Sequence, residues 1–288
     1  MTTRSELARL GVVAALRLRQ KYRRSLGAGL NPYDLAEGMG LTVRFEALSS
    51  LEGVYCSSVP PTIILSSLRP IGRRAFTCAH EIGHHLFRHG TKVDEVAADE
   101  ACRKKFKPEE YLADRFAAEL LMPKLAVQSA FAERHLNVHA CTPESIYIIA
   151  GVLGVGFGTL IDHMQFTLGL LSLAEAAPLR RAAPKAVKEQ LAGCKVPFEL
   201  LVLDEHWRRP ADIEVADIVR IPSEFALTGE ALKICHKDGP IVLAQGACPG
   251  ESTVISNKQA WTGVVRVARR GYQGLSKYRY LEDPEYAV

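Results

Sequence analysis

Two histidines and a glutamate form the pattern H-E-x-x-H at His80, Glu81 and His84. On an α-helix, residues four positions apart lie one turn apart on nearly the same face, so both imidazoles can bind one metal ion from one side. Glu81 projects about 100° further round the helix. There it can take a proton from a water molecule without binding the ion itself. The pattern therefore predicts half of a hydrolytic metal site.

The residues around this pattern favour a helix. Apolar or small residues recur at helical spacing beside the histidines, at Phe76, Ala79, Gly83 and Leu86. An amphipathic helix that merely carries histidines is the simpler interpretation, because a five-residue pattern also arises by chance. A second group of ligands elsewhere in the chain would decide between the two interpretations.

Such a group occurs at residues 110–123, a second helical pattern that Met122-Pro123 interrupts. We expect its inner face to carry Glu110, Ala113, Asp114, Ala117 and Leu121. The alanines would let two helices approach closely enough for a carboxylate to reach a zinc ion at about 2.0–2.2 Å. Asp114 lies one turn after Glu110, where it can accept the second N–H of a liganding histidine.

These residues predict a Zn²⁺ site with His80, His84 and Glu110 as ligands and a fourth position for water. Mn²⁺ or Fe²⁺ would also suit two imidazoles and a carboxylate. Other acidic residues could supply the third ligand instead, namely Asp99, Glu100 and Glu109. Only Glu110 has an aspartate one turn further on, so it is the preferred ligand.

At the same residues the chain resembles a known family. The segments H-E-I-G-H and E-Y-L-A-D-R-F-A-A-E-L-L-M-P are similar to those of the bacterial ImmA/IrrE metallopeptidases, over roughly residues 40–165. The resemblance implies an intracellular, gluzincin-like zinc endopeptidase that cleaves a helix-turn-helix repressor and so relieves repression of stress or mobile-element genes. It also assigns the site residues: His80, His84 and Glu110 as zinc ligands, Glu81 as general base, and Asp114 as a support for a ligand.

Composition indicates a globular protein without a membrane span. The chain has 288 residues, a hydrophobic content of 48% and a net charge of +4, which is too mild to indicate nucleic-acid binding by itself. Its seven cysteines are odd in number and form no C-x-x-C pair, which is typical of reduced thiols in the cytoplasm. Residues 145–161 carry no charge but contain four glycines, and a buried helical pair explains them better than a membrane span.

The first domain is expected at residues 1–135, an α+β, zincin-like metallopeptidase domain with a small antiparallel sheet. Its strands are predicted at 41–48, 53–59 and 62–67. We expect the last of these to be the edge strand that pairs with an extended substrate peptide. On that expectation the substrate-binding residues are Ile64, Ser66 and Tyr55. An ordinary core strand is the alternative.

Residues 136–180 are predicted to form a helix-turn-helix-like helical subdomain. Thr142-Pro143 begins a helix, with threonine as the cap and proline at the first helical position. Gly154 lies at the expected turn. The region contains no lysine or arginine between Arg134 and Arg180. Because DNA binding depends on neutralising phosphates, direct DNA binding is not expected, and the helices are interpreted as a packing or docking module.

The last domain is expected at residues 181–288, as an α+β domain. Most of its pattern is that of strands, with a helix near 224–234. The longer members of the family imply a GAF-like sensor module. A basic and aromatic cluster near the C-terminus would suit either nucleic acid or a solvated strand end, and it comprises Arg266, Arg269, Arg270, Tyr272, Lys277, Tyr278, Arg279 and Tyr280.

Two functions remain open at this stage. The first is a zinc endopeptidase in which Glu81 is the base and an unidentified side chain stabilises the oxyanion, with Tyr55, Tyr111 and His163 as candidates. The second is a metal-containing sensor or DNA-binding regulator without peptidase activity. A structural zinc site usually has four cysteine or histidine ligands, and no fourth ligand stands out in the sequence.

Overall fold

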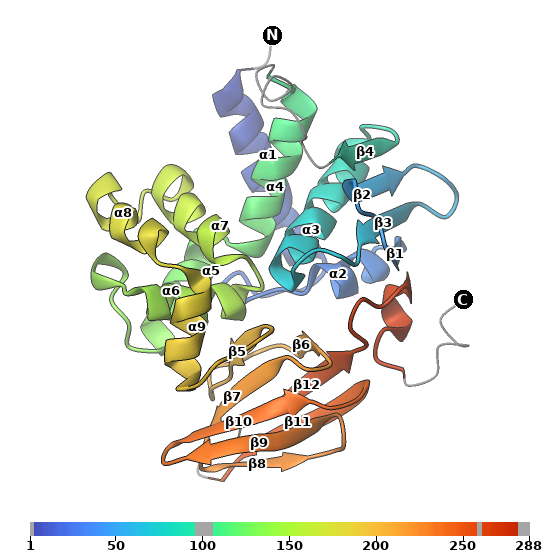
Figure 1. Cartoon of the computed structure of the whole chain (residues 1–288). Coiled ribbons are helices and arrows are strands. Elements are labelled where there is room, and N and C mark those ends of the chain that lie inside the picture. The colour runs from blue at the N-terminus through green and yellow to red at the C-terminus, as the bar shows by residue number, and fades with distance from the viewer. Residues whose placement is uncertain (1–2, 96–105, 258–260, 282–288) are drawn as a thin grey trace. The chain divides into compact units, whose positions relative to one another are not determined.

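The structure, a computed structural model, describes residues 3–95, 106–257 and 261–281, whose helices and strands are shown in Figure 1. The chain forms two compact units. Unit 1 consists of Met1–Val127, Leu153–Val155 and Gln273–Lys277, and unit 2 consists of Gln128–Val152, Gly156–Tyr272 and Tyr278–Val288. Most of the segments predicted as a helical subdomain and a C-terminal domain therefore lie together in unit 2.

Unit 1 contains the three predicted strands and both predicted site helices. Its helices are α1 (Arg4–Lys21), α2 (Pro32–Gly38), α3 (Ile71–Phe87), α4 (Pro108–Leu121) and α5 (Lys124–Glu133), which continues into unit 2. Its strands are β1 (Thr42–Glu46), β2 (Leu51–Cys56), β3 (Thr62–Ser66), β4 (Lys92–Glu95) and β13 (Gly274–Leu275). This mixture confirms the α+β class for unit 1.

The sheet of unit 1 has the strand order β13-β1-β3-β2-β4. β1 and β3 run parallel and the other neighbours antiparallel, so the prediction of an antiparallel sheet is wrong. The prediction that residues 62–67 form the edge strand is also wrong, because β3 pairs with β2 on one side and β1 on the other. Ile63 and Leu65 of β3 are fully buried, as expected of a central strand.

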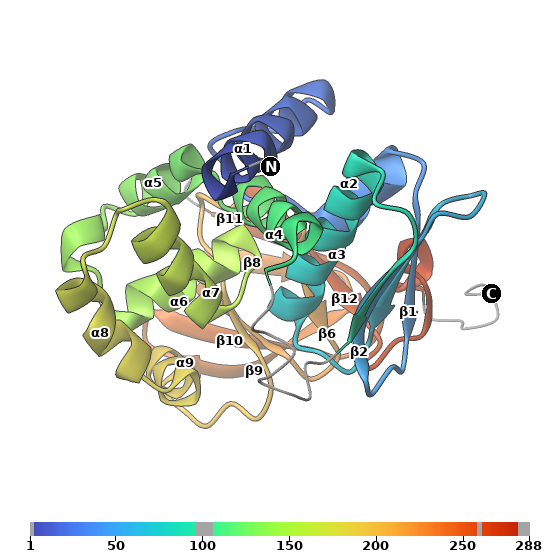
Figure 2. The same cartoon turned by 90° about the horizontal axis from the view of Figure 1, so that it is seen from above.

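The helices of unit 1 are arranged in layers beside this sheet. α3 packs against β2 and β3, α4 packs on α3, and α1 packs on α4. Figures 1 and 2 show α4 between α1 and α3 from two directions. The end of α4 is held by Arg19 of α1, whose buried guanidinium donates from Nε to the carbonyl of Leu120 at 2.8 Å. α4 is thus fixed between two helices.

Unit 2 begins with helices. These are α6 (Pro143–Leu153), α7 (Phe157–Asp162) with a π-helical continuation (His163–Thr167), α8 (Leu173–Arg181) and α9 (Pro184–Ala192). The predicted cap is confirmed, because Thr142 Oγ1 accepts from the backbone N–H of Ser145 at 3.3 Å. α6 and the helix that follows it bend by 99° at a turn where Gly154 has a φ of 73°.

This bend is within the range of helix-turn-helix pairs, although DNA binding or its absence stays a prediction. Among the described residues, no single helix has the length and apolar character needed to cross a membrane. The bent pair of Pro143–Leu153 and Phe157–Thr167 would meet that requirement only jointly, on length and composition.

The remainder of unit 2 is built from two four-stranded sheets. Their strands are β5 (Leu200–Val202), β6 (Ala211–Glu214), β7 (Ile218–Pro222), β8 (Phe225–Thr228), β9 (Leu232–Asp238), β10 (Ile241–Gly246), β11 (Gly250–Ser256) and β12 (Thr262–Ala268). The orders are β5-β7-β10-β9 and β6-β12-β11-β8. Both sheets contribute to one buried cluster, which includes Val219 and Val242 from the first and Val254 and Val265 from the second.

The predicted helix at 224–234 is wrong, because β8 and the start of β9 occupy that segment. Within the predicted domain at 181–288, the helix is α9 (Pro184–Ala192), and residues 200–257 and 261–275 form strands and loops. The physical reason is pairing: β8 is held by backbone hydrogen bonds to β11, a distant segment that periodicity does not reveal. The GAF-like module, which the resemblance to longer family members implied, stays a prediction.

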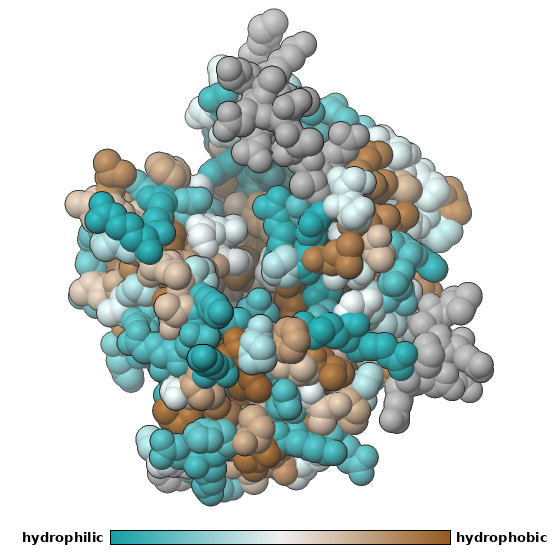
Figure 3. Space-filling view, viewed as in Figure 1, coloured by the Kyte–Doolittle hydropathy of each residue, from teal (hydrophilic) through white to brown (hydrophobic). Residues whose placement is uncertain are grey.

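The basic cluster near the C-terminus is largely neutralised by buried acids. Arg266 Nε lies 2.7 Å from Asp212 Oδ1, and Arg279 Nη2 lies 3.0 Å from Asp212 Oδ2. Arg270 is paired with Asp217 at 2.5 Å. These three arginines are paired with acids of the same unit, whereas Arg269 and Lys277 of the cluster are exposed. Figure 3 shows one face of the molecule, on which hydrophobic residues are separated by hydrophilic ones.

Candidate metal centre

The H-E-x-x-H pattern lies on the buried part of α3. His80 is 5% exposed, and both Glu81 and His84 are 0% exposed. α3 begins after Pro70 and ends at Arg88, whose left-handed backbone terminates the helical hydrogen bonds. Helical spacing places the histidines on the face toward α4, whereas Glu81 lies on the face toward β2.

α3 and α4 approach closely at Gly83. A β-carbon at this position would lie 3.1 Å from Phe116 Cδ1 and 3.2 Å from Ala113 Cα, both on α4. A larger residue would separate the two helices. The absence of a side chain at Gly83, together with the small Ala113, therefore lets a carboxylate of α4 reach the histidines of α3.

Three ligand atoms converge between the helices. His80 Nε2 and His84 Nε2 are 2.9 Å apart, and Glu110 Oε2 lies 3.3 Å from the first and 3.4 Å from the second. A tetrahedral ion at about 2.0–2.2 Å from each ligand requires ligands about 3.3–3.6 Å apart. Among the described residues, these three side chains form the group that fits one ion. Their chemistry suits a divalent metal. Glu110 Oε2 has the required spacing to both nitrogens, whereas the 2.9 Å between the two nitrogens is shorter than a tetrahedral ion needs.

The second nitrogen of each histidine also has a partner. His80 Nδ1 lies 2.9 Å from Asp114 Oδ1, and His84 Nδ1 lies 2.8 Å from His89 Nδ1. A partner at Nδ1 fixes the ring orientation and the tautomer that presents Nε2 to a metal. The structure thus places Asp114 where the sequence predicted it. It also brings in His89, which the sequence analysis did not assign to the site.

Glu110 is ionised in this setting. Hydrogen bonds from His80 and His84 hold the pKa of its carboxyl well below the ordinary value, although partial burial acts in the opposite direction. The carboxylate stays negative at neutral pH, which is the form that binds a cation. Asp114, one turn further along α4, has a side chain that is 59% exposed. Glu110 is therefore the more enclosed of the two acids.

Glu81 lies against the backbone of β2. A β-carbon at Gly53 would lie 2.9 Å from Glu81 Oε1 and 2.5 Å from Thr77 Cγ2, so only glycine lets β2 pass this close to α3. Sequence reasoning did not identify Gly53 as part of the site. The available signal was a glycine inside a strand pattern, which often marks a close approach of another group.

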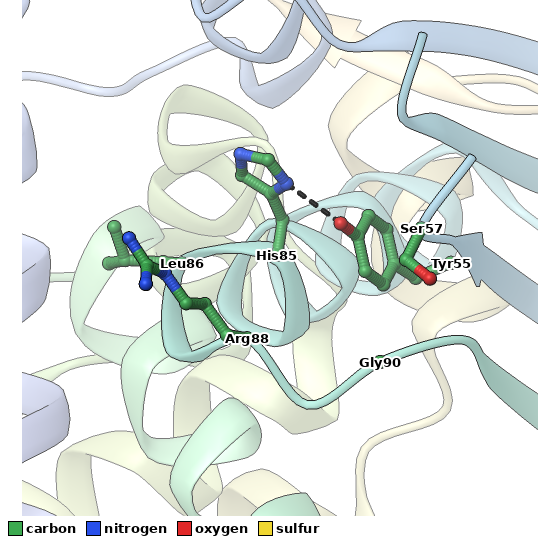
Figure 4. A pocket seen from close by; sticks show the side chains of 6 residues that line it. All are labelled: Tyr55, Ser57, His85, Leu86, Arg88 and Gly90. Carbon is green, nitrogen blue, oxygen red and sulfur yellow. Dashed lines mark hydrogen bonds between the residues drawn. The ribbon is translucent and has the colours of Figure 1, made fainter. Parts of the chain in front are cut away.

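Tyr55, on β2, lines a pocket beside the end of α3. Its hydroxyl shares a 2.9 Å hydrogen bond with His85 Nδ1, as Figure 4 shows. Burial raises the pKa of Tyr55 and lowers the pKa of His85, which keeps both neutral near pH 7. The pocket has a volume of about 480 Å³ and is lined by Tyr55, Ser57, His85, Leu86, Arg88 and Gly90. Its position suits the predicted role of Tyr55 in substrate binding, which stays a prediction.

The other predicted substrate residues lie elsewhere in the sheet. Ser66 is fully buried and donates its hydroxyl hydrogen to the carbonyl of Leu48 at 2.5 Å. Ile64 is paired with Val54 of β2 and with Arg44 of β1, so the backbone around it is already engaged. A peptide cannot pair with this strand, and the assignment of Ile64 and Ser66 to an edge-strand site is wrong.

Among the described residues, Glu109 and Tyr111 are not part of the group of three converging side chains. Asp99 and Glu100 lie outside the described residues. Glu109 forms an ion pair with Lys92. Tyr111 packs its ring near Phe106, with 5.5 Å between centroids, and His163 belongs to unit 2. The oxyanion-stabilising group stays unassigned.

Comparison with known proteins matches part of the chain to one family. Residues 36–159 match the family described as the IrrE N-terminal-like domain, peptidase M78. The matched segment contains His80, Glu81, His84, Glu110 and Asp114. A comparison with curated proteins gives no match.

Proposed function

Residues 36–159 belong to the IrrE N-terminal-like family of metallopeptidases, and from this premise we propose that the chain is a zinc-dependent endopeptidase. The observation that carries the proposal is the convergence of His80 Nε2, His84 Nε2 and Glu110 Oε2 between α3 and α4. Many catalytic zinc sites have two imidazoles and one carboxylate as protein ligands and a water molecule in the fourth position. Mn²⁺ or Fe²⁺ is the alternative occupant.

A bound divalent ion supplies Lewis acidity, which polarises a carbonyl and makes water acidic enough to lose a proton near neutral pH. The residues of the chain supply the remaining functions. Asp114 accepts the His80 Nδ1 proton, and so keeps the His80 Nε2 lone pair directed at the ion. Glu110 adds the negative charge that neutral histidines lack.

Glu81 is the proton carrier in this proposal. It follows His80 directly in the sequence and is fully buried against Gly53, so its carboxylate is confined between α3 and β2. It takes a proton from the attacking water and passes it to the departing amine. The Tyr55 pocket is the proposed binding site for a substrate side chain, because it opens beside the end of α3.

The proposed substrate is a protein, specifically a helix-turn-helix transcriptional repressor whose cleavage relieves repression in a stress or mobile-element response. This part of the proposal rests on the resemblance to the ImmA/IrrE metallopeptidases and not on the geometry. The test is incubation of a candidate repressor with the zinc-loaded protein and with its Glu81→Gln variant, analysed by mass spectrometry. We expect discrete fragments with the native protein, a cleavage rate lowered by about 10²–10⁴-fold with the variant, and equal zinc content in both.

A metal-containing DNA-binding or sensor regulator is the competing function. The 99° bend between α6 and α7 favours it, whereas the lack of lysine and arginine between Arg134 and Arg180 disfavours it. Salt-dependent binding to operator DNA by a zinc-loaded protein that leaves every tested repressor intact would support this competitor.

A further inference from the structure

The chain reverses direction directly after α3. Arg88 has a φ of 58° and a ψ of 43°, the left-handed conformation that terminates helices. The backbone N–H of His89 then donates to the carbonyl of His84 at 3.1 Å, and the N–H of Arg88 donates to the carbonyl of His85 at 3.2 Å. This turn brings His89 back over the last turn of the helix, where it lies beside the side chain of His84.

The His89 ring is held on two sides. Its Nδ1 lies 2.8 Å from His84 Nδ1, with the two rings at 66° to each other. Its face stacks on Phe87 at 5.7 Å between centroids, and Phe87 in turn packs edge-on against Phe116 of α4. The ring is half-buried. Its position is therefore set by backbone and packing, and not only by the hydrogen bond.

The hydrogen bond between two imidazole nitrogens requires one donor and one acceptor. His84 Nε2 faces Glu110 and His80. A cation bound among these three groups would therefore be held by the lone pair of His84 Nε2. The proton of neutral His84 must then be on Nδ1, which makes it the donor. His89 Nδ1 is consequently the acceptor, and His89 carries its own proton on Nε2.

We propose that His89 is a positioning residue for the metal centre: its Nδ1 accepts the His84 Nδ1 proton and thereby points the His84 Nε2 lone pair at the ion. The inference rests on the proposed function, because the role exists only if His84 binds a metal. The two histidine ligands are oriented in different ways, His80 by a carboxylate on α4 and His84 by a neutral ring just beyond α3. A neutral acceptor orients His84 without adding a second negative charge to the cluster.

The test is the Zn²⁺ affinity of the full chain, measured by competition with a chelator, together with the visible spectrum of the Co²⁺-loaded protein. We expect His89→Ala to weaken Zn²⁺ binding by about 10–100-fold and to change the Co²⁺ spectrum. His89→Asn should recover most of the affinity, because the Asn carbonyl oxygen occupies nearly the position of Nδ1 and accepts the same proton. The matched control is His139→Ala, whose side chain is 71% exposed in unit 2; it should leave affinity unchanged.

The outcomes separate the inference from the function on which it rests. Native Zn²⁺ affinity and an unchanged Co²⁺ spectrum in His89→Ala would overturn the role of His89 and leave the proposed function standing. A native chain that binds no divalent metal would overturn both. If His89→Ala lowers the thermal stability of the metal-free protein and His89→Asn fails to restore metal affinity, the role of His89 is structural and the inference is wrong.

Discussion

Gly53 and Glu81 lie so close that a single methyl group does not fit between them: a β-carbon on Gly53 would be 2.9 Å from Glu81 Oε1. A strand glycine is therefore part of the proposed catalytic machinery, although it has no functional group. Its contribution is to let the backbone of β2 approach α3 and confine the Glu81 carboxylate. A side chain added at Gly53 should therefore impair cleavage.

Gly53→Ala should abolish most peptidase activity and leave Zn²⁺ binding intact. The added methyl would also meet Thr77 Cγ2 at 2.5 Å, so the strand must shift or Glu81 must rotate. Overpacking of this kind costs about 1–3 kcal/mol of stability. Cleavage assays and zinc analysis on the same preparation check both effects. The matched control is Gly158→Ala, where no atom lies within 4 Å of the new methyl, and it should cleave normally.

His84→Ala should lose the metal and the stability that the metal provides. An ion present at about 100 times its Kd stabilises the folded chain by about 2.7 kcal/mol, so adding Zn²⁺ to the metal-free native protein should raise its Tm. The variant should show no such rise. The measurement is a thermal scan with and without Zn²⁺. A rise of equal size in the variant would show that His84 is not a ligand.

Asp114 is expected to act on metal affinity through His80. Asp114→Ala should weaken Zn²⁺ binding by about 10–100-fold, because His80 Nδ1 loses its carboxylate partner at 2.9 Å. Asp114→Asn keeps an acceptor without the charge, so its loss of affinity should be smaller. Chelator competition gives both values. Equal affinity in all three proteins would contradict the assignment.

Arg88→Gly should stabilise the end of α3. Arg88 has a positive φ of 58°, which costs a non-glycine residue about 1 kcal/mol relative to glycine. Arg88→Ala removes the same side chain but keeps the conformational cost, and so serves as the control. In denaturant unfolding, the free energy of unfolding of Arg88→Gly should be about 1 kcal/mol higher than that of Arg88→Ala. Indistinguishable midpoints would argue that the left-handed turn carries no strain.

Asp212 should make unit 2 sensitive to acid. Burial favours its neutral form, but attraction to Arg279 and Arg266 outweighs burial and holds its pKa below the ordinary value. A lowered folded pKa means that the stabilisation is complete above about pH 4 and is lost as the pH falls through the folded pKa.

The variant Asp212→Asn leaves two arginines without their shared anion and should cost about 3–5 kcal/mol at pH 7. The difference in unfolding free energy between native and variant protein, measured by urea unfolding, should shrink below about pH 4. A difference that stays constant from pH 7 to pH 3 would rule out this role for Asp212.

The local features of this chain could be predicted from short stretches of sequence. The spacing of His80 and His84 placed both rings on one helical face, and the spacing of Glu110 and Asp114 did the same for the acids. Thr142 caps the helix that follows it, as expected, because capping depends on residues only two or three positions away. Each of these relationships is contained within a single helix or its first turn.

The errors concern pairings between distant segments. The central position of β3, the strands at 225–228 and 232–238, and the burial of Arg266 and Arg279 against Asp212 all depend on partners far away in the chain. Periodicity reports which side of an element is apolar, but it does not identify the element that covers that side. The same strand pattern is therefore compatible with an edge or a central place in the sheet.

By itself, the sequence determined the types of the candidate ligands, their helical spacing and the family that this part of the chain resembles. Only the tertiary structure decided how those ligands are supported: Gly83 and Gly53 set the distances between backbones, and the left-handed turn at Arg88 returns His89 to His84. The physical reason is that the identity of a metal ligand is a property of one residue. Its orientation is a property of the packing around it, and packing is specified by the whole fold.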